Sequence, residues 1–182
     1  MAQSFKTLFL AFLASSFLAL SVQAQSPMSH SSGSIGFKAL EKKDVKAEAT
    51  DFTSSINLVD KSVSFTVPID NFEFKSGLMK KHYLAEGVMN ALNFPNATFV
   101  GDILADSDLS QDGLHDVQAE GQMTILETTL NVLVNGVIEI QGGTANLRAN
   151  FMVNGKEYGI DSKKVDGFVD QMQVMVDVVY GQ

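Results

Sequence analysis

Apolar and polar residues alternate along most of the chain from residue 35 onward. The alternation is clearest in eight runs: Ile35 to Ala39, Val63 to Ile69, Ala97 to Ile103, Val117 to Ile125, Leu130 to Val134, Val137 to Ile140, Ala145 to Val153 and Met172 to Tyr180. A period of two is typical of β-strands that bury one face. The pattern therefore predicts an all-β protein of about eight or nine strands.

Dipeptides that favour tight turns lie between several of these runs. Asn135-Gly136, Gly142-Gly143 and Asn154-Gly155 supply residues that tolerate positive φ, as two-residue hairpin turns require. Consecutive strands are therefore expected to pair antiparallel. Closing such a sheet on itself removes its edges, so we predict an antiparallel β-barrel. A barrel of about eight strands is filled by side chains or holds one small ligand, and periodicity leaves both open.

One stretch interrupts the strand pattern with helical spacing. Between Ser76 and Leu92, Met79 and Tyr83 fall on one helix face, and Gly87 divides the stretch. Pro95 disfavours helical geometry at the residue before it. We therefore predict a short helical insertion at about residues 76–92.

The first 24 residues have the composition of a secretory signal peptide. Lys6 precedes an apolar run from Leu8 to Val22, and Val22 and Ala24 occupy the third and first positions before the expected cut, where small residues are needed. The run of about 15 residues is shorter than the ~20 that span a bilayer. We predict cleavage near Ala24, a flexible lead-in over residues 25–34 and one domain over residues 35–182, located in the periplasm or secreted.

Composition narrows the classes of partner. The chain has 182 residues, no cysteine and a formal net charge of -8, and its 13 Lys and Arg form no cluster longer than a pair. Nucleic-acid binding and electrostatic adhesion to anionic headgroups are therefore disfavoured. After residue 24 no apolar run has membrane-spanning length.

Signatures of catalysis and of metal binding are weak. The histidines His30, His82 and His115 have no metal-ligand spacing. The stretch from Asp106 to Gly113 has oxygen ligands at alternate positions, but its glycine and its last ligand position do not match a calcium loop, so we expect a polar hairpin loop. Nucleophile-elbow, P-loop and dinucleotide motifs are absent from the sequence. We therefore predict a protein that is not an enzyme and needs no cofactor or metal.

Aromatic residues and methionines are the positive feature of the chain. On or beside the predicted strands and helix lie Phe65, Phe72, Phe74, Phe94, Phe99, Phe151, Met79, Met89, Met123 and Met152. A packed core accounts for such residues, and flexible Met beside Phe also suits an adaptable apolar cavity.

The stretch from Leu78 to Ile103 closely resembles the YceI-like family of bacterial envelope proteins. The resemblance rests on Met79, His82, Phe94-Pro95 and Ala97-Thr98-Phe99, and continues through Gly121 to Ile125, Phe151 and Tyr158-Gly159-Ile160. These pieces follow one another in the family's order over about residues 35–180. The chain departs at Leu126 to Thr129, where the family often has a His-Gly-x-Thr turn.

The resemblance implies an eight-stranded, lipocalin-like barrel with a helical segment, exported from the cytoplasm, whose apolar channel holds a polyisoprenoid chain. The matched positions Met79, Phe99, Met123 and Phe151 are then candidate lining residues. To these the residue pattern adds Phe65, Phe72, Phe74 and Tyr83. We therefore predict an exported carrier of an isoprenoid lipid or quinone. The alternative is a filled barrel that acts as a structural or stress-related interaction module, and a homodimer is left open.

Overall fold

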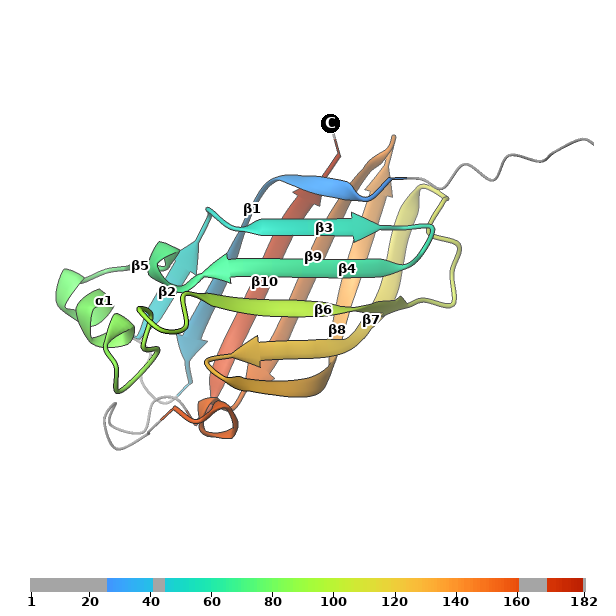
Figure 1. The fold of residues 1–182 in the computed structure, drawn as a ribbon. Coiled ribbons are helices and arrows are strands. Elements are labelled where there is room, and N and C mark those ends of the chain that lie inside the picture. The colour runs from blue at the N-terminus through green and yellow to red at the C-terminus, as the bar shows by residue number, and fades with distance from the viewer. Residues whose placement is uncertain (1–25, 41–44, 161–169, 182) are drawn as a thin grey trace, which may run out of the picture.

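Eight strands close into an antiparallel barrel, with one short helix at one end (Figure 1). The computed structural model describes residues 26–40, 45–160 and 170–181. Around the barrel the strands follow the order β1 (Met28–Ala39), β10 (Met172–Tyr180), β9 (Thr144–Val153), β8 (Thr128–Gln141), β7 (Gly113–Ile125), β6 (Asn96–Leu104), β4 (Ser62–Pro68) and β3 (Thr53–Asn57), which pairs with β1 again. The predicted fold class is confirmed. The predicted signal peptide lies outside the described residues.

Strand β1 closes the barrel because it has partners on both edges. One edge pairs with β10, and the other pairs with β3 near Met28 and with β2 (Lys46–Ala49) from Ile35 to Lys38. Strand β2 also pairs with β5 (Glu73–Phe74). The sheet is therefore wider at the end where β1 finishes.

The prediction of a flexible stretch over residues 25–34 is wrong from Met28 onward, because β1 begins there. Backbone pairing with β10 requires no apolar side chains. The first half of β1 is polar, so the alternation of apolar and polar residues did not predict it. Gly33 has a φ of 146°, and a Cβ there would lie 2.4 Å from the carbonyl oxygen of Asp177. Glycine thus allows β1 to lie close against β10.

Of the three predicted hairpin turns, one is confirmed. Gly142 and Gly143, with φ values of 57° and 84°, connect β8 to β9. Asn135-Gly136 instead lies inside β8, where Gly136 pairs with Ala149. A Cβ on Gly136 would lie 2.9 Å from the carbonyl oxygen of Arg148. This glycine therefore serves close packing of strands and not a turn.

The third predicted turn is also wrong, and one observed turn was not predicted. Asn154-Gly155 leads into the 3-10 helix η2 (Gly155–Tyr158) and forms no two-residue hairpin turn. Strands β7 and β8 are joined by Leu126-Glu127, and Leu126 takes the positive φ of 56°. The prediction missed this turn because neither residue is Gly, Asn or Asp.

The helical insertion is shorter than the predicted 76–92. Helix α1 (Gly77–Leu84) ends because Ala85 is extended, with φ -64° and ψ 153°. Turns follow as far as Pro95, held by hydrogen bonds such as that from the Met89 amide to the Tyr83 carbonyl. Together with the 3-10 helix η1 (Ile69–Asn71), this segment covers part of one rim of the barrel.

The inward faces of the strands differ along the barrel. At the rim opposite α1, large side chains fill the interior: Ile56, Ile103, Leu109, Ile138 and Tyr180 are each no more than 3% exposed. Toward α1 several inward positions carry small residues instead: Ala97, Ala119, Gly136 and Ala149. A hollow remains there because these residues leave unfilled the volume that Ile or Leu would occupy.

Candidate functional site

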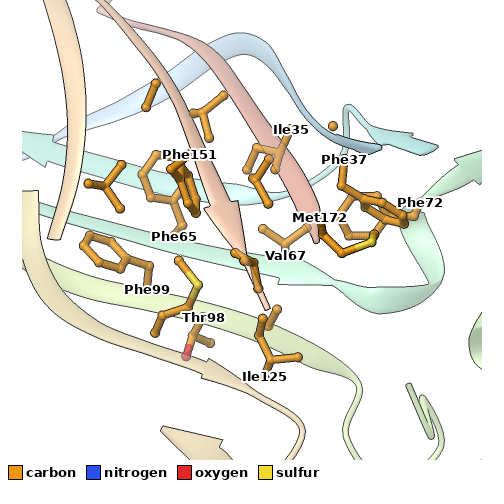
Figure 2. A pocket seen from close by; sticks show the side chains of 18 of the residues that line it. Ile35, Phe37, Phe65, Val67, Phe72, Thr98, Phe99, Ile125, Phe151 and Met172 are labelled. Carbon is orange, nitrogen blue, oxygen red and sulfur yellow. The ribbon is translucent and has the colours of Figure 1, made fainter. Parts of the chain in front are cut away.

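An apolar cavity of about 210 Å³ occupies the half of the barrel nearest α1 (Figure 2). Its walls come from all the barrel strands except β3, together with the segment from η1 to β6. The lining residues are Ile35, Gly36, Phe37, Val63, Phe65, Val67, Ile69, Phe72, Tyr83, Val88, Met89, Ala97, Thr98, Phe99, Val117, Ala119, Met123, Ile125, Val134, Gly136, Leu147, Ala149, Phe151, Val153, Gly155, Ile160, Met172, Val174 and Val176. None of these residues carries a charge at neutral pH.

The cavity reaches the barrel rim at the α1 end. Its lining includes Ile125, the last residue of β7, Val153, the last of β9, and Met172, the first of β10. Thr98 lies beside Ile125, and its hydroxyl is the oxygen visible among the side chains in Figure 2. We call this end the open rim.

The opposite end of the barrel is closed by packed side chains and a buried hydrogen-bond chain. The Ser54 hydroxyl donates to the Ser64 carbonyl at 2.9 Å. The Tyr180 hydroxyl lies 2.6 Å from the same Ser54 oxygen, so it donates to it. Tyr180 is fully buried and does not line the cavity. The cavity therefore has one blind end.

Four aromatic rings form a wall at the open rim. Phe37 of β1 lies 5.1 Å from Phe72 and 5.5 Å from Tyr83, measured between ring centroids. Phe74 of β5 lies 4.9 Å from Tyr83 and 5.8 Å from Phe37. Such spacings suit tilted and edge-to-face contacts, which stabilise aromatic pairs beyond their burial. The cluster therefore fixes α1 against β1.

Six of the eight sequence-predicted site residues line the cavity. These are Phe65, Phe72, Tyr83, Phe99, Met123 and Phe151. Figure 2 places Phe65, Phe99 and Phe151 around one part of the hollow, contributed by three different strands. Their contact with a ligand stays a prediction.

Phe74 and Met79 do not line the cavity. Phe74 packs against the rings of Phe37 and Tyr83, so these rings separate it from the hollow. Met79 is partly exposed because α1 meets the core through its last turn, where Tyr83 is the helix's buried residue. Met79 and Tyr83 are four residues apart, so the helical spacing predicted that they share a buried face. Helix α1 has only eight residues and lies across the rim, so it buries Tyr83 and leaves Met79 partly exposed.

Most of the lining was not nominated from the sequence, although its signal was present. The alternating runs placed Val67, Val117, Leu147 and Val176 on the inward face, but that face includes both the filled and the hollow parts of the barrel. The informative signal is the series of small residues at inward positions described above. Four neighbouring strands, β6 to β9, carry them, and Gly136 and Ala149 are directly paired.

Among the described residues, the polar side chains near His115 serve to order a loop. His115 is buried, with Nε2 donating to the Gln111 carbonyl at 2.9 Å and Nδ1 2.8 Å from the Ser107 hydroxyl. Hydrogen bonds from Ser110 lower the pKa of Asp108. Both contacts order the polar loop between β6 and β7, as the sequence predicted. Within the described ranges, no three His, Asp or Glu side chains group as a metal site requires.

Burial raises the pKa of the Tyr83 phenol, which predicts a specific alkaline instability. The folded chain holds this proton more tightly than the unfolded chain, whose tyrosines titrate near pH 10. The contribution of each such tyrosine to the free energy of unfolding is therefore fully present below about pH 10. Above that pH the free energy of unfolding falls by about 1.4 kcal/mol per pH unit for each of them.

Urea unfolding at several pH values between 8 and 11.5 measures this loss of stability. Tyr83→Phe removes the ionisable group and keeps the ring, so its free energy of unfolding should fall less steeply with pH than the parent's. Tyr180 still contributes in this variant, since burial also raises its pKa against the opposing effect of the Ser54 hydrogen bond. Identical slopes for the two proteins would contradict the assignment.

The chain belongs to the YceI-like domain family. The family model matches residues 25–180, which includes every strand of the barrel. Comparison with the curated proteins found no match. Among the described residues, no helix has both the length and the apolar character needed to cross a membrane.

Solved structures of similar fold include three from bacteria. BcnA of Burkholderia cenocepacia has a TM-score of 0.65 and 16% identity, with 83% of this chain and 95% of that chain covered. The Campylobacter jejuni YceI protein has a TM-score of 0.64 and 14% identity, with 80% and 90% covered. A polyisoprenoid binding domain from Saccharophagus degradans has a TM-score of 0.64 and 9% identity, with 86% and 97% covered. At these identities the likeness establishes the fold.

Proposed function

We propose that this protein is an exported carrier that holds a long apolar chain, of isoprenoid type, in the barrel cavity. The observation that carries the proposal is the lining itself, which is uncharged and almost entirely apolar and reaches the rim at the α1 end. A blind apolar cavity accepts a chain that enters by its hydrocarbon tail. The Saccharophagus degradans neighbour, described as polyisoprenoid binding, supports this choice of ligand class.

The dimensions of the cavity suit a chain better than a compact ligand. Along β7 the lining extends from Val117 to Ile125. At about 3.3 Å per residue and a strand tilt of about 40°, this stretch spans roughly 20 Å along the barrel axis. A volume of about 210 Å³ over that length is narrow. A cavity of about 150 Å³ holds a benzene molecule, so this volume holds about two isoprene units end to end.

Burial of the chain supplies the affinity. Each buried carbon group contributes about 0.8 kcal/mol, so a few isoprene units offset the cost of ordering the ligand. The phenylalanines and methionines of the lining adapt to the branched methyl groups. Since binding needs no reacting group, we propose a role in transport or storage and not in catalysis.

Charges at the open rim favour a neutral head group. Among the cations on and beside α1, Lys80 forms an ion pair with Glu73 at 2.5 Å. Lys75, Lys81 and His82 are exposed and do not line the cavity. A phosphate group is typically bound by at least one partly buried cationic side chain directed at its oxygens. We therefore favour a quinone or a prenyl alcohol over a prenyl phosphate.

The test is mass spectrometry of organic extracts from the protein purified from its native envelope. A stoichiometric isoprenoid, absent after denaturation and refolding without lipid, is the expected result, and its mass names the ligand. A protein that is empty after purification and takes up no added quinone or prenyl alcohol would contradict the carrier function. The filled-barrel interaction module would then be the better description.

A further inference from the structure

Two leucines at the open rim are far more exposed than is usual for their type. Leu78 on α1 is 65% exposed, and Leu92, in the turns before β6, is 97% exposed. Between them in sequence lie Tyr83, Val88 and Met89, which line the cavity. The same segment therefore presents one apolar face to the hollow and two leucines to the outside, at the end of the barrel where Figure 1 shows α1.

Charge is distributed unevenly between the two rims. From residue 69 to residue 95 the acidic and basic side chains balance: Asp70, Glu73 and Glu86 against Lys75, Lys80 and Lys81. The opposite rim is acidic, with Asp60, Asp106, Asp108, Asp112 and Asp116 against Lys61. The segment at the open rim is thus neutral while the loops at the closed end carry net negative charge, so an anionic surface repels the closed end more than this segment.

We infer that the segment 77–92 docks on the surface of a lipid bilayer, with Leu78 and Leu92 inserted among the acyl chains. This inference rests on the proposed function, because an apolar cargo then passes between bilayer and cavity without crossing water. Docking depends on apolar insertion and not on attraction to anionic headgroups, in agreement with the acidic composition of the chain.

A bilayer fits this surface better than a protein partner does. Stable protein interfaces bury about 1,200–2,000 Å² with a continuous apolar centre. Here the two leucines are separated by polar neighbours, among them Lys81, His82 and Asn93, which are exposed. Isolated leucines beside lysines are typical of segments that lie in the headgroup region, where the lysine ammonium reaches water.

The inference is tested by flotation of the chain from Gln25 onward, which contains the whole barrel and lacks the apolar run from Leu8 to Val22. The vesicles are phosphatidylcholine alone and phosphatidylcholine mixed with phosphatidylglycerol. The double variant Leu78→Ser with Leu92→Ser should lose about tenfold in vesicle partition with both lipids. Raising the salt concentration should change partition of the parent little.

The matched control is Leu114→Ser with Leu133→Ser. These leucines are 66% and 56% exposed on β7 and β8, away from the open rim. The control should partition as the parent does. An equal loss in both double variants, or a parent chain that binds neither kind of vesicle, would overturn the inference, and the second result would point to a protein as the docking partner.

Uptake of a fluorescent polyene chain from detergent, without vesicles, separates this inference from the proposed function. Both double variants should bind the polyene as the parent does, because none of the four leucines lines the cavity. Polyene binding with no leucine-dependent partition would overturn docking and keep the carrier. Leucine-dependent partition without polyene binding would overturn the carrier and keep a membrane-docking barrel.

Discussion

Ala149→Trp is expected to abolish uptake of the isoprenoid chain while leaving the barrel folded. Ala149 lies on β9 and faces the hollow, paired with Gly136 on one side and Val176 on the other. An indole placed there extends into unfilled space and occupies much of the 210 Å³. If it displaces one isoprene unit of five carbons, the loss is about 4 kcal/mol, or about a thousandfold in Kd.

The measurement is titration of the polyene or of a quinone, with circular dichroism and thermal unfolding on the same samples. Asn150→Trp is the control, since Asn150 is the next residue on the same strand and is exposed outside. It should bind as the parent does. A second variant, Ala119→Phe, fills the cavity from β7, two strands away from β9 in the barrel, if Ala149→Trp fails to fold. Normal binding by a folded Ala149→Trp protein would show that the cargo lies elsewhere.

These variants depend on which inward residues face the hollow, and that information was only partly present in the sequence. Alternation identified the inward face of each long strand, so Phe65, Phe99 and Phe151 were placed correctly. It could not rank positions along the barrel axis, because a period of two is the same at the filled end and at the hollow end. Strand register decides the level of each residue, and register follows from long-range pairing.

Local turn chemistry predicted some connections and failed at others for an identifiable reason. Gly142-Gly143 is exposed and has the conformation its composition favours. Asn135-Gly136 has the same local preference, yet the pairing of β8 with both β7 and β9 overrides it. The β7–β8 turn shows the converse. Leu126 adopts positive φ because β7 and β8 pair without interruption up to the two residues that join them.

The glycines that lie within strands carry a second strong prediction. Gly101 of β6 and Gly121 of β7 face each other as a directly paired position. A Cβ on Gly121 would lie 2.3 Å from the Val100 carbonyl oxygen and 2.5 Å from the Gly101 Cα. A Cβ on Gly101 would lie 2.4 Å from the Glu120 carbonyl oxygen. All three contacts involve backbone atoms, which cannot rotate away as a side chain does.

Gly121→Val should therefore cost about 3–5 kcal/mol of the free energy of unfolding, out of the roughly 5–15 kcal/mol typical of a domain. Urea unfolding measures the loss, and Gly77→Ala is the control because a Cβ there meets no atom within 4 Å. Gly77 opens α1, so its replacement should be neutral or slightly stabilising.

Substitution of Gly121 also tests why β6 and β7 approach so closely beside the cavity. Phe99 and Met123 flank the glycine pair on the inward face and line the hollow. If the close approach positions these two side chains, Gly121→Ala, a milder change, should weaken polyene binding as well as lower stability. A Gly121→Ala protein as stable as Gly77→Ala would mean that the two strands separate at little cost, and that the glycine pair does not fix the width of the cavity.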